Sequence, residues 1–420
     1  MPSSPHLPRV LHVVISLQPG GLEKLVAEWT TQRNRLAPGR TAVCCLDSSD
    51  TTDVLPGNVP VVTLDAERGR FPWDRRAVRR LREFCLGTGV LREERRSRRA
   101  PGEERLATRM PNEPFDVIHS HNLAAWQYAA LAIRSGEAFH VHTEHGSMRK
   151  KPGRLKSLRI RWLERRTDWI VSVSESAAAE LKRFRALQRS RLTVIANGID
   201  PGEPAADSRA ALRRRYRREL NIPDEARVLG SVGRLASIKG YDRLIQAFQG
   251  IRHLSERTVS ASGGPVYLLL VGDGPESAAL QELAAASGVQ DRIVFAGHRG
   301  DARDMLSAMD VFVLPSRSEG LSLALLEAMA AVVPVMVTDT GDSRNVIADG
   351  AAGVVLPGST ADWPVMIAAQ LAALDTPETR RRLNIAADRL RRQYTLDAMA
   401  DAYEKIYSQA TARRYGPPTC

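Results

Sequence analysis

The chain has 420 residues, of which 43% are hydrophobic and 26% are charged, and its formal net charge is +12. This length predicts two domains, and the composition suits ordinary globular cores rather than a disordered chain. No apolar run approaches the roughly 18 residues that a membrane span needs, and the positive field favours anionic partners without choosing among nucleic acid, acidic lipid and phosphorylated substrates.

The N-terminal segment indicates a cytoplasmic protein. Residues 1–8 lack a cationic stretch before an apolar core, so the apolar run at 10–17 is interpreted as a strand and not as a secretory signal. The four cysteines have neither disulfide nor zinc-site spacing, which favours a reducing cytosol.

Strands and helices alternate through the first half of the chain. The strand at 10–17 is followed by a turn at Gly20-Gly21 and by a helix from 22 to about 33. Glycines let another group approach the backbone closely, and in a doubly wound sheet such a turn lies at the carboxyl edge, where ligands bind. An ordinary tight turn explains the same pattern. Further strands are predicted at 41–46, 59–64, 115–120, 139–143, 169–173 and 192–195.

Two arginine-rich stretches interrupt this alternation. The stretch at 75–109 begins with a possible helix, and 95–112 carries Pro, Gly and dense charge, so a mobile basic insertion is expected there. The stretch at 149–166 predicts a cationic amphipathic helix with a tryptophan, which suits an anionic membrane surface. A solvated helix that covers the sheet is an equally open alternative.

Histidines collect where two predicted strands end. A metal site would use His119, His121, His140, His142 and His145, but these residues lack the carboxylate or cysteine company of a dedicated site. No metal ligand is therefore expected. His119, His140 and His142 are interpreted as structural, and His121 and His145 as polar contacts at a cleft.

A domain boundary is predicted after the turn at Asn197-Gly198, because 201–207 is typical of a linker. The expected domains are 1–203 and 204–394, both Rossmann-like. The segment 395–420 is expected to form a helix that crosses back to the N-terminal domain, with a frayed tail.

The second half restarts the alternation with a strand at 228–232 and a helix at 241–249. Arg234 and Lys239 lie in the loop between them. Two cations in such a loop suit a diphosphate, the arginine as a bidentate fork and the lysine as a point charge.

A glycine-rich run follows the next predicted strand, at 266–271. The run Gly272-Asp273-Gly274-Pro275 begins like a dinucleotide fingerprint but lacks its third glycine. It is therefore interpreted as a turn between a strand and a helix.

The stretch 319–327 is the most informative one. It follows a strand at 311–314 and a turn, and it is predicted to enter an apolar helix that runs to about 331. Backbone N–H groups and a positive helix end at such a turn suit a diphosphate. At ~1.5 Å per helical residue, Glu319 and Glu327 would have Cα atoms on the order of 12 Å apart. A buried helix with a glutamate at each end is the plainer interpretation. Further helices are predicted at 361–374, 377–394 and 396–409.

Together these motifs resemble the retaining glycosyltransferases of family 4, which have the GT-B fold: two Rossmann-like βαβ domains that face a central cleft. The resemblance spans nearly the whole chain and rests on the order and spacing of the Gly20-Gly21 turn with Glu23, His121, Glu144-His145-Gly146, Asn197-Gly198-Ile199-Asp200, Gly233-Arg234, Lys239-Gly240, Gly272-Asp273-Gly274-Pro275 and Glu319 through Glu327. Within the family, the chain is most similar to bacterial transferases that build exopolysaccharides or lipid-linked glycans.

The resemblance implies roles for these residues. Arg234 and Lys239 would hold the diphosphate of a nucleotide-sugar. Glu327 would accept hydrogen bonds from the ribose, and Glu319 would contact hydroxyls of the transferred sugar. With His145 near the reacting centre, the expected catalytic set is His145, Glu319, Arg234 and Lys239.

Further contacts follow from the same resemblance. Backbone amides of Gly320, Leu321 and Ser322 would support the distal phosphate and the sugar. Gly20 and Gly21 would face the phosphates from the other domain. His121 and Asn197 would line the acceptor side of the cleft.

The implied activity is retaining transfer of a sugar from a nucleotide-sugar to a glycan or lipid-linked acceptor, at the inner face of a cell membrane. No cofactor is expected: no Asp-x-Asp pair follows a strand to carry a divalent ion, and the two cations can replace one. No nucleic-acid partner is expected, because no recognised binding module is present. One departure concerns the family's Gly-Gly-x-Pro-Glu run, where this chain has Asn345 in place of the carboxylate.

Three other activities remain open from the sequence. A sugar-nucleotide epimerase or phosphorylase would use the same fold, and the net charge alone would allow a basic nucleic-acid-binding protein. A hydrolase with paired glutamates is disfavoured, because retaining hydrolases need carboxyl groups about 5–5.5 Å apart.

Overall fold

The computed structural model describes residues 7–18, 20–47, 59–67, 73–88, 113–146, 153–183, 192–200, 206–258, 264–347, 353–374 and 376–415. It divides into two compact units, one formed by Met1–Ile195 with Met399–Cys420 and the other by Ala196–Ala398. The expected insertion at 95–112 lies outside the described residues.

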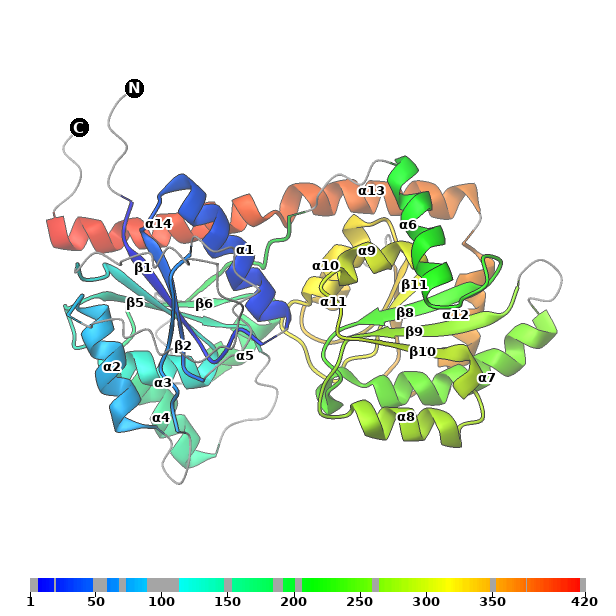
Figure 1. The fold of residues 1–420 in the computed structure, drawn as a ribbon, viewed down its shortest axis with the longest axis horizontal. Helices are drawn as coiled ribbons and strands as arrows, with labels where there is room; N and C mark the ends of the chain where they lie inside the picture. Colours follow the sequence, from blue (N-terminus) through cyan, green and yellow to red (C-terminus); the bar gives the residue numbers. More distant parts are fainter. Residues whose placement is uncertain are drawn as a thin grey trace, which may run out of the picture. The chain divides into compact units, whose positions relative to one another are not determined.

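The first unit is built on a parallel sheet with strand order β3-β2-β1-β4-β5-β6-β7 (Figure 1). Its strands are β1 (Val10–Val14), β2 (Thr41–Cys45), β3 (Val61–Thr63), β4 (Val117–His121), β5 (Phe139–Glu144), β6 (Trp169–Ser172) and β7 (Leu192–Val194). Its helices are α1 (Gly21–Leu36), α2 (Arg75–Cys85), α3 (Asn122–Ala132), α4 (Arg154–Glu164), α5 (Glu175–Arg183) and, from Met399 onward, α14 (Leu396–Tyr415).

The second unit has the strand order β10-β9-β8-β11-β12-β13, again parallel. Its strands are β8 (Arg227–Val232), β9 (Val266–Val271), β10 (Ile293–Gly297), β11 (Val311–Leu314), β12 (Val335–Thr338) and β13 (Gly353–Leu356). Its α-helices are α6 (Ala206–Glu219), α7 (Tyr241–Thr258), α8 (Ser277–Ala286), α9 (Ala302–Met305), α10 (Leu323–Ala330), α11 (Ser343–Val346), α12 (Trp363–Ala372) and α13 (Pro377–Gln393). Short 3-10 turns are η3 (Ser237–Lys239), η4 (Gln290–Arg292) and η5 (Leu306–Ala308).

Each sheet has helices on both faces, as the nearly continuous apolar strands predict. In the first unit, Leu11 and Val13 of β1 pack with α2 and α3, whereas His12 between them faces Trp29 of α1. In the second unit, α7, α8 and α12 pack on one face around a large apolar cluster, and α6, α9, α10 and α13 lie on the other (Figure 1). The prediction of an α/β fold with two Rossmann-like sheets is confirmed.

The observed elements depart from the sequence predictions at several places. The strand expected at 10–17 ends at Val14. Helix α6 begins at Ala206, inside the stretch that the sequence indicates as a linker. The sequence of this helix is mostly charged and lacks a clear apolar stripe, so no helical pattern marks its start. The second unit begins at Ala196 rather than near residue 203. Among the described helices, none combines the length and the apolar character that a membrane crossing requires.

Candidate functional site

The strand orders place a topological switch point at the centre of each sheet. In the second unit, β8 and β11 are neighbours, and the strands that follow each of them lie on opposite sides. Ligands of such sheets bind outside the carboxyl ends of the strands at this point. Lys239 lies in the loop after β8 and Glu319 in the loop after β11. The topology itself therefore brings these two predicted residues to the switch point.

Lys239 and Glu319 form an ion pair there. The Lys239 ammonium donates to Glu319 Oε1 at 2.7 Å, and the Ser316 hydroxyl donates to the same oxygen at 2.6 Å. The lysine side chain is 27% exposed and the glutamate side chain 10%. The carboxylate is thus held from two sides, while the ammonium keeps access to an additional anionic partner.

The loop that carries Glu319 is fixed by the η3 loop beside it. Gly240 has φ +71°, and a Cβ atom at this position would lie 2.2 Å from the carbonyl oxygen of Pro315. The Arg317 amide donates to the Ile238 carbonyl at 2.8 Å. Only glycine combines this backbone conformation with so close an approach. The contact holds the two loops together and so fixes the position of the ion pair.

A second glycine braces the same loop from the β12 side. Gly341, between β12 and α11, has φ +56°, and a Cβ atom there would lie 2.1 Å from the Gly320 carbonyl oxygen. The Asp342 amide donates to that carbonyl at 3.1 Å. Asn345, which the resemblance sets in place of a carboxylate, donates a 3.4 Å hydrogen bond from its side-chain amide to Asp342 Oδ1.

The prediction that Glu319 stands at the start of the helix is wrong. Helix α10 starts at Leu323, and Ser322 is its N-cap, with the hydroxyl accepting from the Leu325 amide. The ~12 Å helical spacing between the two glutamates therefore does not apply. Glu319 lies in the preceding loop, and Glu327 lies half-buried within α10.

The residues just before α10 present backbone donors. The N–H groups of Gly320, Leu321 and Ser322 donate to no other residue that the structure describes. Unpaired amides at a helix N-terminus bind anions. The buried side-chain amide of Asn197 donates to the Leu321 carbonyl at 3.1 Å. Asn197, which the resemblance places at the acceptor side, thus holds the backbone that carries these amides.

Arg234 follows β8 with an exposed side chain. Its guanidinium makes no hydrogen bond or ion pair with the described part of the chain. Its loop contacts the turn after β9: a Cβ atom on Gly272 would lie 2.0 Å from the Gly233 carbonyl oxygen, and the Leu235 amide donates to the Asp273 carbonyl at 2.9 Å. The glycine at 272 is therefore needed for contact between two loops.

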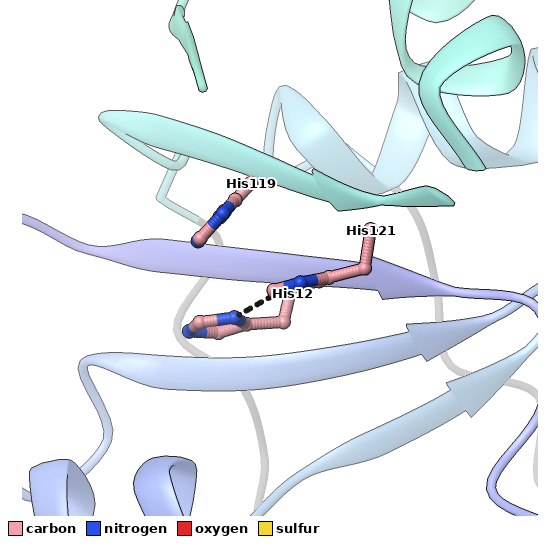
Figure 2. Close-up of side chains that lie close together, drawn as sticks. All are labelled: His12, His119 and His121. Carbon is pink, nitrogen blue, oxygen red and sulfur yellow. Dashed lines mark hydrogen bonds between the residues drawn. The ribbon is translucent and has the colours of Figure 1, made fainter. Parts of the chain in front are cut away.

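In the first unit, the predicted residues also lie at the carboxyl edge of the sheet. Gly20 is the N-cap of α1 and Gly21 its first residue. His121 ends β4, and His145 follows directly after β5. Nδ1 of His121 lies 3.1 Å from Nε2 of His145, and Nε2 of His121 lies 3.1 Å from Nδ1 of His12, a contact that Figure 2 shows. The structure thus brings His121 and His145 together and adds His12.

His12 carries no sequence signal, because it lies in the middle of β1 rather than at a strand end. It pairs in register with His119 of β4, on the sheet face that α1 and α14 cover. Only the pairing of β1 with β4 brings it beside His121, and a single sequence does not specify that pairing.

Three of these histidines have the spacing of a metal centre. One ligand nitrogen from each of His12, His119 and His121 lies within 4.8 Å of the others. The nitrogens of His119, however, are hydrogen-bonded to the hydroxyls of Tyr407 at 2.6 Å and Thr143 at 2.7 Å. A bound metal would have to break such contacts, and no carboxylate of the described residues joins the three histidines. The donor set fits a hydrogen-bonded cluster better than a metal centre.

Burial keeps these rings neutral. It lowers the pKa of His12 to about 3, with the charge of Arg33 acting in the same direction. It lowers the pKa of His145 to about 4 against the opposing effect of Glu144. It lowers the pKa of His121 well below its usual value, and the neighbouring histidines add to the effect. At neutral pH each of the three imidazoles therefore carries one ring proton.

His140 and His142 lie on the opposite face of the same sheet. The Ser120 hydroxyl lies 3.0 Å from His140 Nε2 and 3.1 Å from His142 Nδ1. The His142 ring stacks on Trp126 of α3 with centroids 3.9 Å apart. Both rings are buried among these partners, so they present no polar atom to the ligand edge.

Family comparisons match both halves of the chain. Residues 20–203 match the description "Glycosyltransferase Family 4", and residues 213–390 match "Glycosyl transferases group 1". The D-inositol 3-phosphate glycosyltransferase of Stackebrandtia nassauensis is 30% identical over 338 residues, which cover 76% of this chain and 73% of the relative. The α-D-kanosaminyltransferase of Streptomyces kanamyceticus is 30% identical over 59% of this chain and 63% of its own length.

Among solved structures, Anabaena HepE in complex with UDP and glucose has the same fold. It superposes with a TM-score of 0.74 at 17% identity, covering 96% of this chain and 99% of its own. WaaG, a glycosyltransferase involved in lipopolysaccharide biosynthesis, superposes with a TM-score of 0.69, also at 17% identity. The match covers 95% of this chain and 99% of WaaG.

Proposed function

Because the chain belongs to glycosyltransferase family 4 and has the GT-B fold, we propose that it is a retaining, metal-independent transferase acting in bacterial polysaccharide or glycoconjugate synthesis. It moves a sugar from a nucleotide-sugar to a glycan or lipid-linked acceptor on the cytoplasmic side of a membrane. The donor side of this proposal rests on the second unit, and the acceptor side on the first.

The ion pair of Lys239 and Glu319 at the switch point is the observation that carries the proposal. Cleavage of a sugar–phosphate bond leaves negative charge on the departing diphosphate. The partly exposed Lys239 ammonium, the Arg234 guanidinium, which has no partner among the described residues, and the amides at 320–322 are available donors for that charge. Since the protein supplies this positive charge itself, the proposal needs no divalent ion.

We assign the two glutamates to the remaining parts of the donor, its sugar and its ribose. Glu319, held by Lys239 and Ser316, is assigned to hydroxyls of the transferred sugar, because an ionised carboxylate accepts hydrogen bonds only. Glu327, half-buried on α10, is assigned to the ribose hydroxyls. HepE was solved with UDP and glucose, which makes UDP-sugars the first donors to test.

Helix α4 supports an acceptor at a membrane surface. Its buried side packs through Ile160 and Leu163, while Leu155, Leu158 and Trp162 are 85%, 60% and 38% exposed. These three positions follow the i, i+3, i+7 spacing of one helix face, and arginines and a lysine surround them. Such a face lies in the headgroup region of an anionic bilayer.

Names of relatives add one alternative acceptor. The relative from Stackebrandtia nassauensis is named for D-inositol 3-phosphate, so a phosphorylated polyol belongs in the acceptor panel beside lipid-linked sugars. The phosphate of such a polyol agrees with the net charge of +12.

A two-step experiment tests the proposal. First, UDP-, GDP- and ADP-sugars are screened for thermal stabilisation, where a bound donor raises the melting temperature as its saturation increases. Second, the stabilising donor is incubated with EDTA, with and without each acceptor. Acceptor-dependent product with an unchanged anomeric configuration supports the proposal.

Each alternative has its own outcome. A changed sugar nucleotide without acceptor indicates an epimerase, and sugar 1-phosphate formed with phosphate indicates a phosphorylase. An EDTA-sensitive rate contradicts the metal-independent assignment.

A further inference from the structure

Three imidazoles form a hydrogen-bonded chain at the carboxyl edge of the first sheet. It runs from His12 on β1 through His121 at the end of β4 to His145 after β5, with 3.1 Å between the nitrogens at each step. His12 and His121 are buried, and their ring planes are nearly parallel, with an interplanar angle of 13°. Figure 2 shows the hydrogen bond between the two rings. His145, by contrast, is half-buried. The chain therefore joins the protein core to the ligand edge.

Proton counting links the tautomers of the three rings. A neutral imidazole has one N–H donor and one bare nitrogen acceptor. His121 uses both nitrogens on histidine partners, so it donates to one neighbour and accepts from the other. The tautomer of His12 consequently decides whether His145 Nε2 is a donor or an acceptor.

The buried end of this row of histidines, at His12, favours one of the two directions of hydrogen-bond donation. Nε2 of His12 is buried and has no hydrogen-bond partner among the described residues. A buried N–H without a partner is rarer than an acceptor without one. The lack of a described partner at Nε2 therefore favours a bare Nε2, which places the His12 proton on Nδ1. His12 then donates to His121, and His121 donates to His145.

We propose that His12 and His121 are positioning residues that hold His145 in the tautomer with its proton on Nδ1. Because His145 Nε2 accepts from His121, the ring offers an N–H donor at its other nitrogen. The inference rests on the proposed function in one respect: the acceptor of this hydrogen bond is a sugar hydroxyl or phosphate oxygen of the nucleotide-sugar. In this state His145 acts as a hydrogen-bond donor and not as a base.

The first test reads the tautomer directly and needs no activity. Histidine labelled with ¹⁵N distinguishes protonated from bare ring nitrogens in long-range ¹H–¹⁵N spectra, and His145→Gln assigns the signal. The expected result is a protonated Nδ1 and a bare Nε2 on His145 in the full chain. The opposite tautomer overturns the proposal.

Two variants test the coupling. His12→Leu removes the terminal donor, so His145 should change to a mixture of tautomers or to the opposite one. His12→Asn places an amide N–H near the position of Nδ1, so it should restore the original signal. Trp29→Phe is the matched control, because it alters the packing against His12, with ring centroids 4.7 Å apart, without removing a link of the chain.

Kinetics separate this inference from the proposed function. If the wild-type protein transfers sugar, His12→Leu should lower kcat about tenfold, the worth of one hydrogen bond, with KM for the donor little changed. His12→Asn should recover most of that loss, and Trp29→Phe should lose little. Equal losses in all three variants, or an unchanged His145 tautomer in folded His12→Leu, overturn the inference. Absence of transfer by the wild-type protein contradicts the proposed function and leaves the tautomer measurement to decide the positioning role.

Discussion

The two units both place a switch point between their central strands, but they place opposite chemistry there. In the first unit, β1 and β4 carry buried neutral imidazoles. In the second, the loops after β8 and β11 carry an ammonium and a carboxylate in contact. Similar topology thus creates a ligand edge twice, and the residues on and after the central strands decide whether that edge is charged or neutral. We call the edge with Lys239 and Glu319 the charged edge, and the edge with His12, His121 and His145 the neutral edge. We assign leaving-group stabilisation to the charged edge and hydrogen-bond donation to the neutral edge.

The charged edge is tested most severely by Lys239→Ala. Removal of the ammonium takes away a fixed cation for the departing diphosphate, so kcat should fall about 100- to 1,000-fold. Melting temperature should change little, since the lysine is partly exposed. The control is Arg252→Ala, a cation of the same unit that contacts Gly288 and Asp291 instead. Comparable activity losses in both variants would reject the site assignment.

The neutral edge is tested by acid. A histidine whose folded pKa lies below its ordinary value of about 6.5 contributes stability that is fully present above pH 6.5 and is lost as the pH falls toward its folded pKa. Burial lowers the pKa of His12 to about 3 and of His145 to about 4 at this edge, and it lowers the pKa of His140 to about 4 on the opposite face of the same sheet. Each such histidine should lower the free energy of unfolding by about 1.4 kcal/mol for each pH unit between 6.5 and its folded pKa.

Hydrogen exchange resolved by peptide gives the measurement, at pH 7 and pH 5 after correction for the intrinsic exchange rate. Protection from exchange should fall in β1, β4 and β5 of the first unit, because their buried histidines take up protons once these strands open. It should remain nearly constant in β8 and β11, which contain no histidine. Equal loss of protection in both sheets would show that the buried imidazoles are not the cause.

The glycine brace of the charged edge is tested by Gly341→Ala. The added Cβ atom would lie 2.1 Å from the Gly320 carbonyl oxygen at φ +56°, so the loop that carries Glu319 must move. Donor affinity should fall about tenfold, together with a loss of roughly 1–3 kcal/mol of stability. Gly288→Ala shares the positive φ, at +68°, but meets no atom within 4 Å. It should show a similar backbone cost and unchanged donor binding, so a loss of binding in both would point to general destabilisation.

The sequence predicted the charged edge better than the neutral one, for a physical reason. Lys239 and Glu319 lie in loops that follow strands, and the carboxyl ends of parallel strands meet at one edge. His12 lies mid-strand, so its role depends on the register of β1 with β4, which no local pattern specifies. The sequence prediction starts α10 too early, although Ser322, a preferred N-cap residue before an apolar run, marks the true start at Leu323.

The smallest expected effect concerns α4 of the first unit. Replacing Leu155 and Leu158 by serine removes exposed apolar area without touching the buried side of the helix. Partition onto vesicles with anionic lipid should fall several-fold, because each leucine contributes only the area that enters the bilayer. The matched control is serine at Val365 and Ile385, which are 62% and 59% exposed in the second unit. Sedimentation at low and high salt measures the partition, and binding should also weaken as salt rises. An equal loss in both double variants, or equal binding to neutral vesicles, would remove the membrane role from α4 and leave the acceptor to reach the first unit from solution.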